Sequence, residues 1–338
     1  MTERTDPVLE VSDLTIAFAT EKGPATSVEG LSFSLLPGQT LGLVGESGSG
    51  KSVTSMAVMG LLPRSAAVTG SIRLGGEELL GRTEDQLREV RGNRIAMIFQ
   101  DALAALNPVH TVGEQLAEAV RVHRRGLGSH ELRERAVELL DTVGIPSPEQ
   151  RVDQYPHEFS GGMRQRIMIA MSIANEPEVL IADEPTTALD VTVQAQVLDV
   201  LRRIQERTGT AMLLITHDLG VVAGLADRVL VMYAGKKIEE APVEPIFYET
   251  AHPYTFGLLD SMPRLDRTAD GSELFSIPGT APEPTALPQG CRFAPRCGYA
   301  VAGLCDAGPV PVRELAADHT AACLRIDEVR IARRGGAV

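Results

Sequence analysis

Eight consecutive residues combine glycines, hydroxyls and a lysine at a spacing that suits phosphate binding. They are Gly45, Glu46, Ser47, Gly48, Ser49, Gly50, Lys51 and Ser52. Glycines at these intervals let the backbone curl, so that successive N–H groups point inward and form a nest for an anion. Lys51 then reaches the β- and γ-phosphates of a nucleotide, and the Ser52 hydroxyl ligates Mg²⁺. We predict a nucleotide site that uses all eight residues; the alternative is a Gly/Ser-rich surface turn.

The segments on either side of this loop predict the elements that hold it. The apolar run Leu41–Val44 is typical of a buried strand, and Val53–Leu62 is typical of a helix that stops at Pro63. The positive end of this helix, which begins at Lys51, points at the same anion. Strand, loop and helix in this order are the context that a phosphate-binding loop needs.

Two adjacent carboxylates follow another apolar run and suit the hydrolysis of a bound nucleotide. The run Val179–Ala182 ends in Asp183 and Glu184. Asp183 is placed to hold Mg²⁺ at the end of a strand, and Glu184, one residue further, to orient the attacking water. A solvated acidic turn is the alternative.

The remaining patterns predict an α/β domain with added sheets and helices. Three segments alternate as in a small antiparallel sheet: Val8–Phe18, Leu31–Leu36 and Ser71–Leu74. Ala211–Ile215 and Val229–Tyr233 are continuous apolar runs, as expected of strands covered on both faces. Between about Gln100 and Tyr155 the apolar period is helical.

After about Glu240 the composition changes, because Pro and Gly become frequent. We therefore place a nucleotide-binding domain at 1–240, with a helical subdomain at about 101–175. A loop-rich extension follows at 241–338.

Charge and hydropathy argue against several classes of function. The chain has 338 residues and a formal net charge of −13, whereas a nucleic-acid-binding protein carries a basic stripe. Met1–Glu10 lacks the basic start and apolar centre of a secretory signal. No apolar run approaches the ~20 residues that span a bilayer. We expect an acidic, soluble protein with no nucleic-acid partner, whose membrane role would come from another subunit.

The stretch Phe159–Arg166, which contains Ser160, Gly161 and Gly162, resembles the signature motif of ABC ATPases. Ser160 is suited to cap a helix over Met163–Ala174, and the glycines leave backbone donors open to a phosphate. The resemblance implies that this phosphate belongs to ATP held by another subunit. Phe159 and Met163 depart from the usual form of the motif, and this variant resembles that of oligopeptide and dipeptide importer subunits.

Further motifs match the same family in its order along the chain. Gln100 resembles the glutamine that senses Mg²⁺ and water, and His217 resembles the switch histidine that contacts the γ-phosphate. Thr187–Asp190 resembles the D-loop, which gives Asp190 a place at the nucleotide, and Phe18 is placed like the residue that stacks on adenine. The resemblance implies an ABC-type nucleotide-binding domain with a RecA-like α/β core, an antiparallel β subdomain and an α-helical subdomain. Glu184 and His217 would be its catalytic residues.

The tail adds a second resemblance. His252–Thr255 and Gly290–Cys297 look like the C-terminal extension of oligopeptide/dipeptide importer ATPases, some of which carry a [4Fe–4S] cluster on four cysteines. The four cysteines of this chain all lie there, and they are Cys291, Cys297, Cys305 and Cys323. Four thiolates hold either an iron–sulfur cluster or zinc. We favour the cluster, with zinc, free thiols or disulfides as alternatives.

Together the resemblances imply an ATP- and Mg²⁺-dependent ATPase subunit of a peptide importer. Its partners would be a second ABC ATPase subunit, two transmembrane permease subunits and an external solute-binding protein. It would sit at the cytoplasmic face of the cell membrane. The alternatives are an importer ATPase for nickel or another small solute, a soluble ABC ATPase without a transport role, and a non-enzymatic iron–sulfur sensor.

Overall fold

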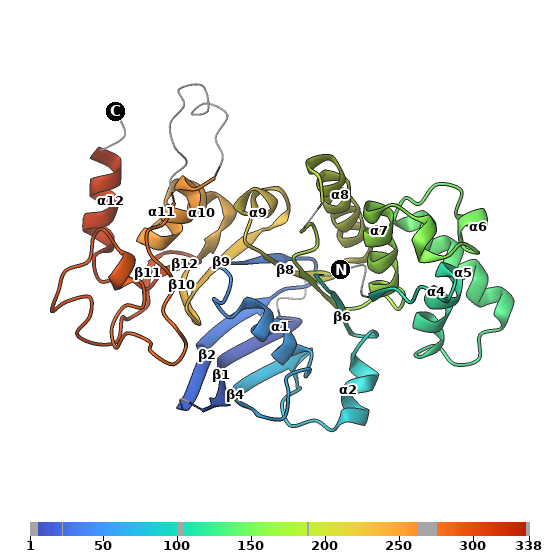
Figure 1. Cartoon of the computed structure of the whole chain (residues 1–338), viewed down its shortest axis with the longest axis horizontal. Coiled ribbons are helices and arrows are strands. Elements are labelled where there is room, and N and C mark those ends of the chain that lie inside the picture. The colour runs from blue at the N-terminus through green and yellow to red at the C-terminus, as the bar shows by residue number, and fades with distance from the viewer. Residues whose placement is uncertain (1–5, 22, 101–104, 188, 263–275, 336–338) are drawn as a thin grey trace.

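The phosphate loop lies at one end of a central sheet. The computed structural model describes residues 6–21, 23–100, 105–187, 189–262 and 276–335. The central sheet has eight strands in the order β11-β12-β10-β9-β3-β8-β7-β6 (Figure 1). Its parallel part comprises β9 (Arg228–Tyr233), β3 (Thr40–Val44), β8 (Ala211–Thr216), β7 (Val179–Asp183) and β6 (Ile95–Ile98). Every residue of β3, β6, β7 and β8 is buried, as predicted for strands covered on both faces.

A second, antiparallel sheet packs below the phosphate loop. It has the order β2-β1-β4-β5, with β1 at Leu9–Thr20, β2 at Gly23–Leu35, β4 at Ala66–Leu74 and β5 at Glu77–Glu78. Its strands appear in blue in Figure 1, beside helix α1 (Lys51–Val58). A continuous apolar cluster that includes Leu14, Leu31, Leu43 and Ile181 joins the two sheets. The predicted antiparallel subdomain is confirmed, although β2 starts well before Leu31.

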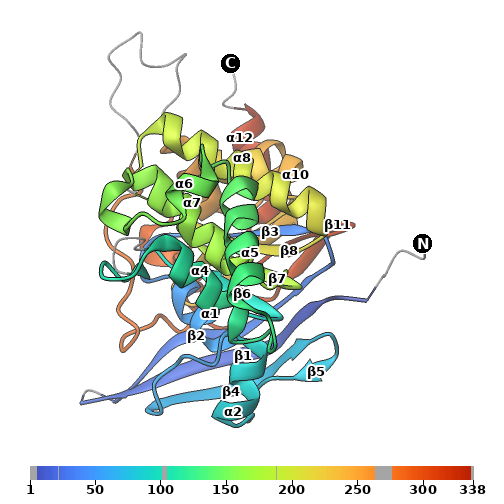
Figure 2. The same ribbon diagram turned by 90° about the vertical axis from the view of Figure 1, so that its right-hand side faces the viewer.

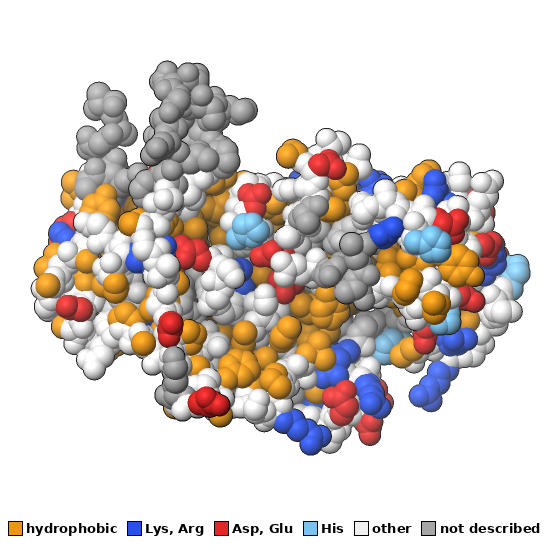
Figure 3. All heavy atoms as spheres, viewed as in Figure 1, with side chains coloured by type: hydrophobic (Ala, Val, Ile, Leu, Met, Phe, Trp, Pro, Cys, Tyr) orange, Lys and Arg blue, Asp and Glu red, His pale blue; other side chains and the backbone are white. Residues whose placement is uncertain are grey.

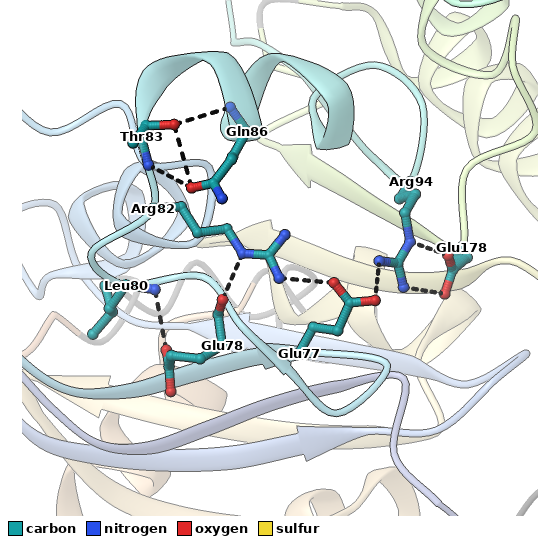
Figure 4. Close-up of polar contacts among 8 residues, drawn as sticks. All are labelled: Glu77, Glu78, Leu80, Arg82, Thr83, Gln86, Arg94 and Glu178. Atoms are coloured by element: carbon teal, nitrogen blue, oxygen red, sulfur yellow. Dashed lines mark hydrogen bonds and ion pairs between the residues drawn. The ribbon is translucent and has the colours of Figure 1, made fainter.

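Polar contacts tie this sheet to the edge of the central one. Figure 4 shows Arg94 between Glu77 of β5 and Glu178, which directly precedes β7. Arg82 bonds the same Glu77 at 2.7 Å. Helix α2 (Glu84–Val90), which the sequence analysis did not identify, begins next to these residues at a Thr83 cap. Acidic and basic side chains intermix over α2 on the face in Figure 3, as in the Arg88–Glu84 pair.

The helical subdomain lies beyond β6, at one edge of the central sheet (Figures 1 and 2). It contains α4 (Val112–Arg121), α5 (Ser129–Thr142), α6 (Pro148–Arg151), the 3-10 turn η1 (Pro156–Glu158) and α7 (Gly161–Ser172). One large apolar cluster joins these helices to β6, β7 and α8 (Val191–Thr208). Ser160 caps α7 as predicted, because its Oγ accepts a hydrogen bond from the Met163 N–H at 3.4 Å.

The C-terminal extension lies at the opposite edge of the same sheet. It includes α10 (Val243–Tyr248), α11 (Pro253–Asp260), the 3-10 turn η3 (Ala294–Arg296), β11 (Arg313–Ala316), β12 (His319–Ala321) and α12 (Ile326–Gly335). β12 pairs with β10 (Lys236–Pro242), so the extension adds two strands to the central sheet. The predicted boundary near Glu240 therefore falls inside β10, and the domain limits stay a prediction. Across the described residues, no helix combines the length and the hydropathy needed to cross a bilayer.

Candidate nucleotide-binding site

Backbone geometry explains why glycines occupy the turn between β3 and α1. At Gly45 a Cβ atom would lie 2.3 Å from the Met232 carbonyl oxygen, so another residue could not fit. Gly50 has a φ of 103° and caps α1 in the left-handed conformation, and its Cβ would lie 2.7 Å from the Ser27 carbonyl oxygen. These two positions hold the loop against its neighbours and let α1 begin at Lys51, as predicted.

The lysine of the loop is folded back onto the loop itself. Lys51 Nζ donates hydrogen bonds to the carbonyl oxygens of Gly45 at 2.7 Å and Glu46 at 2.9 Å. Burial lowers the pKa of Lys51, while Glu184 and Asp183 act in the opposite direction. The ammonium therefore lies inside the curl of the loop, where a phosphate group would be held.

Ser52 and Asp183 meet at the adjoining end of β7. Ser52 Oγ lies 3.4 Å from Asp183 Oδ1. Burial raises the pKa of Asp183, and the neighbouring Glu184 carboxylate adds to the effect. A hydroxyl and a buried carboxylate are oxygen donors of the kind that Mg²⁺ prefers, so this pair has suitable chemistry for the predicted cation.

Glu184 is the centre of a hydrogen-bonded group. Its carboxylate accepts from Gln100 Nε2 at 3.0 Å and from Thr187 Oγ1 at 2.8 Å, and it lies 3.1 Å from His217 Nδ1. Its own N–H donates to the Ile215 carbonyl oxygen at 2.8 Å, in a backbone with a positive φ of 49°.

Burial acts to raise the pKa of Glu184, but hydrogen bonds from Thr187 and His217 outweigh it, and the pKa is lowered. The structure thus brings three predicted residues together, namely Gln100, Glu184 and His217. Thr187 was named only as part of the D-loop, and its contact with the carboxylate follows from the turn after β7.

Other predicted residues lie apart from the loop in this single chain. Ser160 and Gly161 are exposed, and among the residues described no hydrogen bond joins them or Gly162 to the phosphate loop. Figure 1 shows α7 in the helical subdomain, away from α1. Asp190 caps α8, with its Oδ1 3.0 Å from the N–H groups of Thr192 and Val193.

The remaining predicted residues have different surroundings. Phe18 lies on β1, partly buried against the apolar cluster between the sheets. Ser47 and Gly48 are exposed at the tip of the loop, while Ser49 is buried. Ala188 of the predicted D-loop lies outside the described residues.

The Glu46 side chain turns toward the C-terminal extension rather than toward the curl of the loop. Its carboxylate binds Arg296 with two nitrogen–oxygen distances of 2.8 and 3.2 Å. Sequence analysis did not single out Arg296. Its only signal was its position within the Gly290–Cys297 stretch, beside a cysteine.

The four cysteines line one small pocket of the extension, and all four are free thiols. Burial raises the pKa of Cys291 and Cys297, and it raises that of Cys323 to about 11. Among the described residues, however, no group of three or more His, Cys, Asp or Glu side chains is arranged to hold a metal ion. The expectation of a metal site is therefore not supported by the arrangement of ligands.

Comparisons with known proteins agree with both halves of this architecture. A model of the ABC transporter family matches residues 28–187, and a model of the oligopeptide/dipeptide transporter C-terminal region matches residues 238–305. The oligopeptide transport ATP-binding protein OppD of Mycobacterium tuberculosis is 53% identical over 323 residues, covering 96% of this chain and 52% of that protein. A putative peptide import ATP-binding protein of Brucella abortus is 50% identical over 321 residues, covering 95% of each.

The chain thus spans about half the length of its mycobacterial relatives and nearly all of the Brucella one. A solved structure of cbiO1 from Clostridium perfringens, described as part of the ABC transporter complex cbiONQ, matches with a TM-score of 0.62 and 27% identity. The match covers 78% of this chain and 97% of that one. The predicted ABC-type fold is confirmed. The chain belongs to the family of ABC transporter ATP-binding proteins that carry the oligopeptide/dipeptide transporter C-terminal region.

Proposed function

We propose that this chain is the ATP-hydrolysing subunit of an ABC importer that powers the uptake of peptides. One observation carries the proposal: Lys51, Ser52, Asp183, Glu184 and His217 converge at one end of the parallel strands. The relatives named for oligopeptide transport and peptide import, about half identical in sequence, favour peptides over nickel or another small solute as cargo.

The residues around the phosphate loop bind the substrate. In this proposal the N–H groups of the loop and the Lys51 ammonium hold the β- and γ-phosphates of ATP. Ser52, Asp183 and Gln100 would hold Mg²⁺, and the cation would supply positive charge to neutralise the phosphate oxygens. Phe18 stacks on adenine.

Glu184 and His217 act at the γ-phosphate. The lowered pKa of Glu184 keeps its carboxylate ionised, so it accepts a hydrogen bond from the attacking water and orients it. His217 contacts the γ-phosphate, and its bond to Glu184 at 3.1 Å fixes the two side chains relative to each other. Gln100, bonded to the same carboxylate, links this chemistry to the membrane subunits.

The exposed signature motif supports a second ATP-binding subunit, or cassette, as a partner. Because Ser160 and Gly161 are exposed and Gly162 does not bond the phosphate loop of its own chain, we assign these residues to ATP held by the other subunit. We place Asp190 at the same contact between the two subunits. Hydrolysis then requires the two subunits to close on ATP. Two permease subunits would receive that movement at the cytoplasmic face of the membrane, and an external solute-binding protein would deliver the peptide.

A Glu184→Gln substitution tests the function. We expect ATP binding to persist while turnover falls by about 10²–10⁴-fold, because an amide does not accept a proton from water. ATP binding and phosphate release are measured on the purified chain with its permeases. Glu178→Gln is the matched control, since Glu178 precedes the same strand but pairs with Arg94 outside the site. Ordinary turnover in Glu184→Gln would contradict the assignment.

We further propose that the four cysteines hold a [4Fe–4S] cluster. The support is that all four line one pocket together with His252, whose Nε2 is buried and has no hydrogen-bond partner among the described residues. His252 Nδ1 accepts from the Tyr254 N–H at 3.0 Å, so Nε2 carries the proton and is a donor. The cluster would stabilise an extension with a small apolar core.

Anaerobic purification tests this proposal through composition rather than activity. We expect iron and acid-labile sulfide in the wild-type chain, and the loss of most of both in Cys297→Ser, because a serine hydroxyl is a poor ligand for iron in such clusters. Arg313→Gln in the same extension should retain both. Zinc without sulfide would establish the alternative site, and a chain free of both metals would exclude either.

A further inference from the structure

The carboxylate, the backbone N–H and the carbonyl oxygen of Glu46 in the phosphate loop each make hydrogen bonds. Its carboxylate accepts from both terminal nitrogens of Arg296, at 2.8 and 3.2 Å. Its backbone N–H donates to Tyr254 Oη at 2.8 Å. Its carbonyl oxygen accepts from Lys51 Nζ at 2.9 Å. The residue that orients the phosphate-binding lysine is thus bonded to two residues of the C-terminal extension.

Arg296 is rigidly placed for this contact. Its side chain is only 7% exposed. Nε donates to the Pro278 carbonyl oxygen at 2.8 Å, and Nη1 lies 3.2 Å from Tyr233 Oη. The guanidinium also lies over the rings of Tyr233 and Phe293, at 5.7 and 5.9 Å from their centroids. A two-pronged, largely buried ion pair of this kind is stronger and more directional than an exposed one.

Tyr254 is equally fixed, at the start of α11. It is fully buried, and its ring packs against Tyr233 at 4.6 Å and Phe293 at 5.4 Å between centroids. Phe293 lies directly before η3, which ends at Arg296. One aromatic cluster therefore supports both contacts with Glu46.

We propose that Arg296 and Tyr254 are positioning residues that fix the phosphate loop, so that the C-terminal extension sets the affinity of the site for ATP. This inference rests on the proposed ATP site. A loop with three glycines has many conformations to lose when it binds phosphate. Two contacts on Glu46 remove part of that freedom in advance and hold the carbonyl that aims Lys51.

Calorimetric titration of Mg·ATP into the 338-residue chain tests the inference. We expect Arg296→Gln to weaken ATP binding about tenfold, equivalent to about 1.4 kcal/mol, with an unchanged binding stoichiometry. The ATP affinity of Arg296→Lys should lie between those of Arg296→Gln and wild type, because lysine keeps the charge but cannot form the bidentate contact. A variant that is simply misfolded in part would lower the stoichiometry and keep the dissociation constant, so the two effects are separable.

Arg313→Gln is the matched control. Arg313 is also an ion-paired arginine of the extension, but its partner Asp327 lies on α12, far along the chain from the loop. We expect its ATP affinity to equal that of wild type. A tenfold loss in this variant as well would show a general effect of the extension and would overturn the assignment to Arg296.

A double-mutant cycle identifies the contact itself. Glu46→Gln should weaken ATP binding as Arg296→Gln does, and the double variant should be little worse than either, because both remove one interaction. Fully additive effects, or a change of less than twofold in both single variants, would overturn the proposal. If Arg296→Gln does not fold, Tyr254→Phe decides: it removes only the hydroxyl, and unchanged affinity there is the contradicting result.

The titration gives a different result if the proposed ATP site itself is wrong. If wild type itself shows no binding of ATP, the proposed site is wrong. If wild type binds ATP and the Glu46 and Arg296 variants match it, the site stands and only the positioning role is lost.

Discussion

The helical subdomain and the C-terminal extension lie at opposite edges of the eight-stranded sheet, and each packs on that sheet through a different apolar cluster. The helices share a large apolar cluster with β6, β7 and α8. The extension has a small buried cluster of its own, Ala251, Ala321 and Ile326. It also shares a second apolar cluster with β3, β9 and β10, to which it adds aromatic contacts and ion pairs. Their relation to the phosphate loop also differs, since the extension bonds Glu46 directly while the signature does not reach the loop of its own chain.

This difference separates two kinds of control over one site. We propose that the extension, bonded to the loop within the same chain, acts on how tightly ATP is held. We propose that the signature, which needs a second ATPase subunit, acts on turnover after the two subunits have met. Variants on the two sides should therefore change different quantities.

Between these two regions, the larger expected effect is in the signature. Gly161→Glu adds a carboxylate where no atom of the described residues lies within 4 Å of a new Cβ, and acidic residues are favoured in the first turn of a helix. The fold and the ATP affinity of the single chain should persist. Turnover in the assembled importer should fall about 10²–10³-fold, as when one preorganised donor to a transition state is lost.

Gly224→Glu is the control for added charge, because Gly224 is also a helical glycine with open space around its Cβ position. It should leave phosphate release unchanged. If Gly161→Glu hydrolyses ATP at the wild-type rate in the assembled complex, the signature does not act on the partner's nucleotide, and the contrast between the two regions disappears.

A smaller effect concerns packing between α7 of the helical subdomain and α8. A Cβ at Gly162 would lie 2.4 Å from Val193 Cγ1, so in Gly162→Ala the Val193 side chain or one of the helices must shift. A Cβ at Gly161 would meet no described atom within 4 Å. Both substitutions gain the same helical propensity. We expect Gly162→Ala to be less stable than Gly161→Ala by about 1–3 kcal/mol in denaturant unfolding. Equal stabilities would show that Val193 moves without cost.

Much of the site was predictable because its residues are set by local requirements. Glycines at 45 and 50, the carboxylates after β7 and the Ser160 cap follow from backbone geometry and capping within a few residues. Buried parallel strands give continuous apolar runs, which reveal β3, β7 and β8. Helix α2 was missed because it is short and mostly exposed, and its capping signal is brief.

The sequence by itself predicted the phosphate loop, the pair of acids after β7 and the family, since each depends on residue types at short, fixed spacings. Only the tertiary structure decided what Glu46 does. Its partners Arg296 and Tyr254 lie more than two hundred positions away, and a long-range ion pair leaves no periodic trace in a single sequence. The extension reaches the loop because β9 and β10 bring Tyr233 and the chain that follows it beside β3, which is a consequence of sheet order rather than of local pattern.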